Sequence, residues 1–226
     1  MTSPSNQSFC ETLCSCEAGG ADAFRLRRHD TCPAMEIVVR GKNNEPVDLT
    51  DWTATATLFY IRRIYSPAAD DDTLLYLDAT KSVNIGDVIR AETPDAPREL
   101  MLVSAVDREA DTITVTRGHD STTPVALPDE QVLVGLKATD IPVEIVLETL
   151  EAQQASYYQV EAGTPSDDPV IVSSKLLVKW RSSDTLHAGD YYVQVELENT
   201  DTGEKMTLPR GSTGYPVRIS QDANDT

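Results

Sequence analysis

The sequence has few cysteines, few aromatic residues and no long apolar run. Four of its 226 residues are cysteines, and none of them follows Cys32. The main body is therefore not built on a disulfide framework. No stretch approaches the roughly 18 to 20 apolar residues that a membrane-spanning helix needs, so we expect no membrane partner. The segment MTSPSNQSFCETLCSC lacks a basic region and an apolar region, so we expect no secretory signal.

Positive charge is also scarce. The chain has 19 Lys and Arg residues against 37 Asp and Glu residues, which gives a formal net charge of −18. The densest basic segment, RLRRH at residues 25–29, is short. A chain of this charge is repelled by phosphate backbones, so we expect no nucleic-acid partner.

The sequence does contain many segments that alternate with a period of two. TATATLFY (53–60), TITVT (112–116) and YYVQVEL (191–197) place apolar side chains at every second position. Because successive side chains of a strand point to opposite faces, each segment predicts a half-buried strand. Further β-rich runs are separated by polar turns, and the turn NTDTGE is typical of a hairpin. The whole pattern predicts an all-β fold, a sandwich or a barrel.

One segment, IPVEIVLETLEAQQASYYQ at residues 141–159, supports two interpretations. It alternates as far as Leu147, and then ETLEAQQA offers good helix formers without a breaker. We expect a strand to about Leu147, followed by either a short helix or a continuing strand.

The composition shifts near SPAADDD (66–72) and near KATD (137–140). These shifts predict a small β-module inserted into a sandwich whose halves lie on either side. The expected parts are an extended N-terminal arm with the cysteine cluster (1–24), the sandwich (25–72 plus 138–220), the inserted barrel-like module (73–137) and a loose tail (221–226).

Two parts of the chain resemble proteins of tailed bacteriophages. The flanking segments LRRHDTCPAMEIVVRGKNNEPVDLTDWTATATL and HAGDYYVQVELENTDTGEKMTLPRGSTGYPVRI resemble the immunoglobulin-like domain of baseplate upper proteins and related small virion proteins. The central segment IGDVIRAETPDAPRELMLVSAVDREADTITVTRGHDSTTP resembles small β-modules of phage head and tail proteins. The resemblance covers most of residues 25–220. It implies an immunoglobulin-like β-sandwich interrupted by the inserted module.

The same resemblance implies a structural, non-enzymatic virion component, assembled in the host cytoplasm through contacts with other virion proteins and copies of itself. It points to the tail or baseplate region. It also leaves open a head decoration, head fibre or neck protein, or a virion module that binds a host receptor or glycan. The insertion and the cysteine-bearing N-terminus depart from the simple baseplate domain.

The segment DTITVTRGHDSTTP gathers side chains that could suggest a catalytic site: Arg117, His119, Asp120 and Ser121. A nucleophile system needs its members held in hydrogen-bonding order by a buried scaffold, which adjacent residues on a tight turn rarely achieve. Gly118 permits a left-handed turn, and the polar side chains can bond to loop amides. We therefore expect a structural turn and no catalytic residues.

The cysteines Cys10, Cys14, Cys16 and Cys32 form the candidate metal site. Four thiolates could hold a tetrahedral zinc ion, with His29 as a spare ligand. The spacing favours free thiols over either metal or disulfides, and it leaves all three open. Because a phage protein folds in a reducing cytoplasm, any disulfides would form only after lysis. We expect no other cofactor.

The larger aromatic residues suggest a core and a contact surface. We expect Trp52 and Trp180 to be buried in the sandwich. In each of the pairs Tyr157–Tyr158 and Tyr191–Tyr192, one ring must face outward, where it could anchor a contact.

Overall fold

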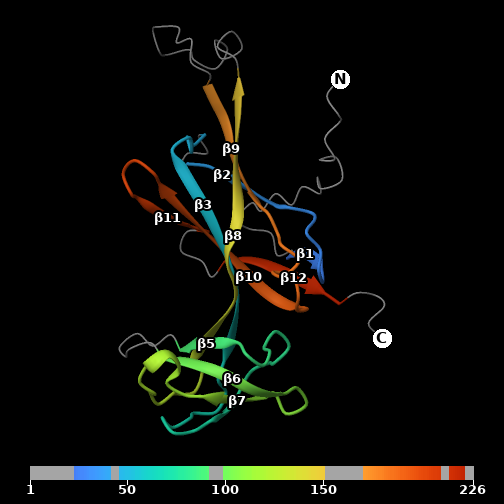
Figure 1. The fold of residues 1–226 in the computed structure, drawn as a ribbon, viewed down its shortest axis with the longest axis vertical. Coiled ribbons are helices and arrows are strands. Elements are labelled where there is room, and N and C mark those ends of the chain that lie inside the picture. The colour runs from blue at the N-terminus through green and yellow to red at the C-terminus, as the bar shows by residue number, and fades with distance from the viewer. Residues whose placement is uncertain (1–22, 42–45, 92–98, 151–169, 210–213, 222–226) are drawn as a thin grey trace.

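The computed structural model describes residues 23–41, 46–91, 99–150, 170–209 and 214–221, and within these ranges the chain is all-β, as predicted. Figure 1 shows two bodies along the long axis of the molecule, joined by the strands β3 and β8. No helical segment of the described ranges has the length and hydropathy that a bilayer span requires. The strands are β1 (Phe24–Arg27), β2 (Met35–Val39), β3 (Trp52–Arg63), β4 (Leu74–Tyr76), β5 (Val88–Ala91), β6 (Leu100–Asp107), β7 (Thr112–Thr116), β8 (Val132–Leu150), β9 (Val170–Val178), β10 (Gly189–Asn199), β11 (Lys205–Leu208) and β12 (Tyr215–Ser220).

The first body is a sandwich. One sheet has the order β1-β12-β10-β3-β8, with β11 also paired to β10, and the other sheet is formed by β2, β9 and the second half of β8. β8 pairs with β3 as far as Pro142 and with β9 from Val143 onward, so it belongs to both sheets. The change from β3 to β9 occurs after Pro142, which has no amide donor to bond to a partner strand. The Pro142 carbonyl accepts the Lys179 amide at 2.8 Å.

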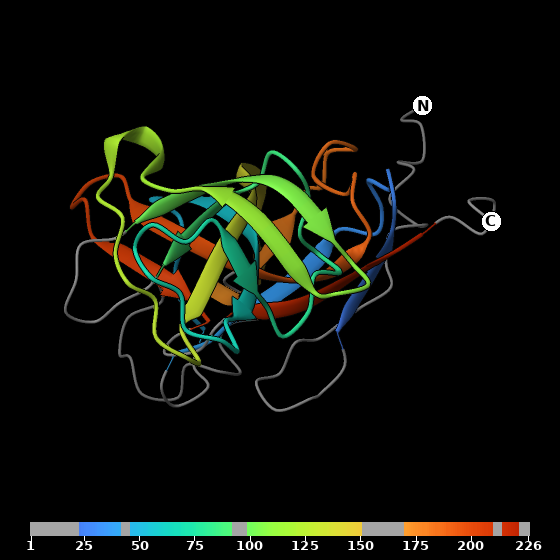
Figure 2. The same ribbon diagram turned by 90° about the horizontal axis from the view of Figure 1, so that it is seen from below.

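The second body is a small closed barrel. β4 to β7 pair in the order β5-β6-β7-β4, and β5 also pairs with the first residues of β8, which pair in turn with the end of β3. The circle closes just after β3, where Ile64 bridges Leu77 and the Tyr65 amide donates to the Tyr76 carbonyl at 3.1 Å. Closure removes free sheet edges. The view from below looks onto this barrel, with the sandwich behind it (Figure 2).

The predicted alternation is confirmed by burial. In β10 the four side chains Tyr191, Val193, Val195 and Leu197 are all buried, and β7 buries Ile113 and Val115. The buried residues of sandwich and barrel form one continuous apolar cluster. The interior of the fold is therefore shared by the two bodies.

The aromatic residues partly follow expectation. Trp180 is buried and stacks on Phe24 at 6.3 Å between ring centroids, whereas Trp52 is only half-buried. Tyr191 faces the core, and its neighbour Tyr192 is half-buried against Phe59, with 6.0 Å between ring centroids. Tyr157–Tyr158 lie outside the described residues.

The ambiguous segment after Leu147 is a strand as far as the structure describes it. β8 continues to Leu150, where it pairs with Val170 of β9, so the helix alternative is wrong for residues 148–150. Pairing with β9 outweighs the helix propensity of this segment, because tertiary contacts override local preference. The rest of the segment, residues 151–159, lies outside the described residues.

Two glycines permit close packing where the bodies meet. Gly135 of β8 lies opposite Tyr60 of β3, and a Cβ atom there would lie 2.0 Å from the buried Tyr60 Cζ atom. At Gly189, the first residue of β10, a Cβ atom would lie 2.6 Å from Ser82 Oγ of the barrel. Any side chain at either position would displace a neighbour.

Candidate functional site between the sandwich and the barrel

Arg117, which follows β7, forms a buried ion pair with Glu99, which precedes β6. The Arg117 side chain is 5% exposed and the Glu99 side chain 0%. Nε and Nη2 of Arg117 each lie 2.7 Å from a different oxygen of Glu99, the bidentate geometry that fits a guanidinium to a carboxylate. The Glu99 oxygens also accept the amides of Gly118 and Val125, both at 3.1 Å.

The remaining donors of Arg117 bond to the backbone. Nη1 donates to the carbonyls of Ala69 and Asp72 at 2.9 and 3.0 Å, and Nη2 also donates to the Val125 carbonyl at 2.5 Å. The ion pair therefore connects four segments of the barrel: the β3–β4 connection, the start of β6, the end of β7 and the segment before β8. This is a structural clamp, because its groups are saturated by the protein itself.

The pKa of Glu99 reflects this clamp. Burial acts to raise the pKa, but the hydrogen bonds from Arg117 and from the amides of Val125 and Gly118 outweigh it, so the pKa lies below its ordinary value. The Glu99 carboxylate is therefore held in its charged form.

The residues that follow this arginine are not joined by hydrogen bonds in the order that a nucleophile system needs. His119 Nε2 lies 3.5 Å from Asp120 Oδ1, and no hydrogen bond joins Ser121 to either residue. Instead, Thr122 Oγ1 donates to the His119 carbonyl at 2.8 Å and accepts the Leu100 amide at 3.0 Å. The side-chain oxygen of Thr122 thus serves the turn in the way the sequence predicts.

Only part of the predicted cysteine site lies within the described residues. Cys32 is disulfide-bonded, whereas Cys10, Cys14 and Cys16 lie outside these residues. Among the residues that the structure describes, no group of three or more His, Cys, Asp or Glu side chains is placed to hold a metal ion. Zinc at the four cysteines stays a prediction.

A second buried charge cluster lies at the junction of the two bodies. Lys137 Nζ of β8 lies 2.7 and 2.6 Å from the two carboxylate oxygens of Asp87, and their side chains are 7% and 11% exposed. Tyr60 Oη donates to Asp87 Oδ2 at 2.9 Å, and the Lys137 ammonium lies 5.3 Å from the Tyr60 ring centroid. Burial lowers the pKa of Lys137, and the hydrogen bonds and charge of Asp87 oppose this effect.

Next to this cluster, a loop of the barrel is fastened to the sandwich. Ser82 Oγ donates to the Asp190 carbonyl of β10 at 3.0 Å and accepts the Asp190 amide at 3.1 Å. Arg62 Nη2 also donates to Ser82 Oγ, at 2.8 Å. Ser82 is fully buried, so these bonds fix the loop between β4 and β5 against the first residues of β10.

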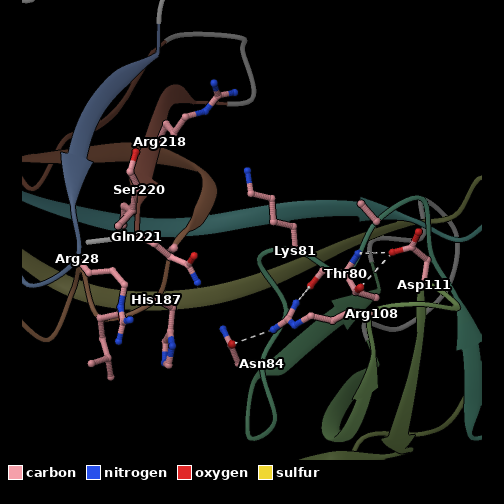
Figure 3. Close-up of a pocket in the computed structure, with 14 residues that line it drawn as sticks. Arg28, Thr80, Lys81, Asn84, Arg108, Asp111, His187, Arg218, Ser220 and Gln221 are labelled. Carbon is pink, nitrogen blue, oxygen red and sulfur yellow. Dashed lines mark hydrogen bonds between the residues drawn. The ribbon is translucent and has the colours of Figure 1, made fainter. Parts of the chain in front are cut away.

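Beside the fastened loop lies a cleft of about 780 Å³, lined by residues of both bodies. The barrel contributes Lys81, Asn84 and Arg108, and the sandwich contributes Arg28 and Arg218. Figure 3 shows these two sets of side chains on facing walls. Of the residues that the structure describes, this group of basic side chains around one cleft is the best candidate for a binding site.

The pKa of His187, the histidine of the cleft, is lowered by its surroundings. Partial burial and the nearby charge of Lys137 lower the pKa of His187, with smaller contributions of the same sign from Arg28 and Arg108. Asp87 acts in the opposite direction. His187 is therefore held mainly in its neutral form near pH 7.

Sequence reasoning missed this cleft. Its basic residues come from separate segments of the chain, and none of them forms a motif with its sequence neighbours. The only local signal was the basic segment RLRRH, which contains Arg28. Comparison with known proteins provides no guide, since no protein-family model and no curated protein matches the sequence.

Proposed function

We propose that this chain is a structural, non-enzymatic component of a tailed-phage virion, placed in its tail or baseplate region. The resemblance of residues 25–220 to phage baseplate and head–tail domains supports the placement. One observation carries the proposal: the buried charged residues bond to partners within the protein itself. Arg117 and Glu99 are saturated by internal bonds, and Lys137 forms a buried ion pair with Asp87, so both pairs are used inside the fold.

Rigidity between the two bodies supports a role as a building block. β3 and β8 both run from the sandwich into the barrel and stay paired through two register shifts between Ala56 and Phe59, so two paired strands connect the bodies (Figure 1). The bonds of Ser82 to Asp190 and the shared apolar core add a second connection. A body with two such connections keeps its shape, as repeated assembly contacts require.

The surface of the barrel offers a site for such contacts. Tyr65, Leu74 and Tyr76 are 50%, 45% and 39% exposed, and the two tyrosine rings meet edge to face at 5.8 Å between centroids. Exposed aromatic residues of this kind are favoured anchors at protein interfaces. We assign this surface to contacts with a neighbouring virion protein or another copy of the chain.

The proposal is tested by the protein composition of purified particles. Mass spectrometry of tailed-phage particles made with this gene should detect the chain at a fixed copy number relative to the other virion proteins. Particles made with Tyr65→Ser/Tyr76→Ser should contain less of it, while Leu186→Ser, an apolar residue of the sandwich that is 39% exposed, serves as the control. Wild-type particles that lack the chain would contradict the proposal.

The same exposed tyrosine pair supports a second candidate function, a virion module that binds a host receptor or glycan. Aromatic faces at a surface can stack on a flat partner. Binding of the isolated protein to host cells that is lost with Tyr65→Ser/Tyr76→Ser would favour this function. Particles that still contain the variant chain but no longer attach to the host would separate it from an assembly role.

A further inference from the structure

The cleft between the bodies carries positive charge on a chain that is strongly negative. Four of its lining residues are basic: Arg28, Lys81, Arg108 and Arg218. Asp111 is the only acidic residue among the described residues that line it, so the lining carries four positive charges and one negative charge. A concentration of one sign in a concave site focuses the electrostatic field and attracts ions of the other sign.

The basic side chains of the barrel wall are held in place. Arg108 Nη1 donates to the Thr80 carbonyl at 2.6 Å, and Nη2 donates to the Val83 carbonyl at 3.0 Å. These partners are neutral, so they fix the guanidinium without cancelling its charge. Asp111 is already engaged, because one of its oxygens accepts both the amide and the hydroxyl of Thr80 at 3.1 Å.

The sandwich wall faces Arg108 with a second group of donors. Arg28 Nε donates to the Leu186 carbonyl at 3.0 Å, which holds its guanidinium at the cleft. Arg218 and Lys81 share one carboxylate, Asp190, at 2.6 and 3.4 Å, so together they keep an excess of positive charge. Figure 3 shows Arg28 and Arg218 on one side and Lys81 and Arg108 on the other.

We propose that this cleft binds a small polyanion, a molecule with two or more phosphate or carboxylate groups, between the sandwich and the barrel. Guanidinium groups match the geometry of both oxyanions and bind them through paired hydrogen bonds. The volume of about 780 Å³ is larger than one oxyanion fills, and basic residues on both walls suit a ligand that carries charge at more than one point. The inference does not depend on the placement of the chain in a virion.

A ligand bound in this way contacts both bodies. It therefore stabilises the folded chain by RT ln(1 + L/Kd), where L is the free ligand concentration, since the cleft exists only in the folded state. Because its contacts are largely between charges near the surface, binding weakens as the salt concentration rises.

The experiment is calorimetric titration of the full chain with two probes, pyrophosphate and citrate, at low and at high salt. The test variant is Lys81→Gln/Arg218→Gln, at side chains that are 62% and 52% exposed. The control is Lys179→Gln/Lys205→Gln, which removes the same charge from exposed residues away from the cleft that also pair with carboxylates. Thermal unfolding with and without probe is the second measurement.

We expect at least one probe to bind the wild-type chain and to raise its unfolding temperature. The affinity should fall by about tenfold or more in the test variant and by less than about twofold in the control. Binding of pyrophosphate alone would identify a phosphate ligand, and binding of citrate alone a carboxylate ligand. The absence of binding of either probe at millimolar concentration, or an equal loss in both variants, would overturn the inference.

Discussion

At the scale of single residues, the fold depends on charged groups that are buried and fully bonded. Such a pair adds little over an apolar pair of the same shape, because the loss of hydration cancels much of the attraction. Removal of one partner is different, since it leaves the other charge buried without compensation. Arg117 with Glu99 is the clearest case in the described residues, with side chains 5% and 0% exposed.

We therefore expect Arg117→Met to lower the free energy of unfolding by about 3–5 kcal/mol. Exposed ion pairs contribute far less, and Arg63 pairs with Glu130 at 3.4 Å with side chains 56% and 67% exposed. The matched control Arg63→Met should cost less than about 1 kcal/mol. Urea unfolding followed by circular dichroism measures both changes, and equal losses would show that Arg117 is no more than a surface residue.

The pH dependence of stability gives a second check on this pair. The pKa of Glu99 is lower in the folded chain than its ordinary value of 4.5. Its contribution is therefore complete above about pH 4.5 and is lost as the pH falls through the lower folded value. The stability difference between wild type and Glu99→Gln should be constant near neutral pH and shrink in acid. A difference that grows in acid would contradict the lowered pKa.

At the scale of elements, the pairing of β3 with β8 holds the sandwich and the barrel together. This pairing needs Gly135, because the ring of Tyr60 occupies the space in which a side chain would lie. The sequence QVLVGLK reads as an ordinary strand with one glycine, and a glycine within a strand is a signal of close approach by a neighbour. The identity of that neighbour could not be read from the sequence.

We expect Gly135→Ala to destabilise the chain by about 3 kcal/mol, the upper end of typical overpacking, because the Cβ atom would lie 2.0 Å from Tyr60 Cζ. In a Tyr60→Leu background the same substitution should cost clearly less, since the smaller side chain vacates the space. A double-mutant cycle of unfolding free energies measures the coupling. Additive losses would show that the contact does not control the pairing.

Prediction from sequence succeeded where a signal is local. The alternation in YYVQVEL predicted the buried face of β10, and NTDTGE predicted the hairpin between β10 and β11, where Gly203 has φ +70°. It failed where a residue's role depends on distant partners. Glu99 bonds to Arg117, which lies 18 positions later in the chain. The segment RELMLV, which contains Glu99, predicts only a strand that begins after a charged residue.

At the scale of the whole molecule, the chain is two β-bodies joined by two continuous strands, with a basic cleft between them. The composition shifts near residues 66–72 and 137–140, which predict an inserted module, are a local signal of the sequence. The cleft has no such signal, since Arg28, Lys81 and Arg218 are brought together only by the docking of the barrel on the sandwich. A sequence that is negative on average gives no sign of a positive site formed by folding.

The central proposal is that this chain is a structural, non-enzymatic component of a tailed-phage particle. Labelling of intact particles with an antibody against the chain, viewed by electron microscopy, tests it most directly. We predict label at a constant position at the tail or baseplate end of each particle. Intact particles without label anywhere, from lysates in which the chain is abundant as free protein, would contradict the claim.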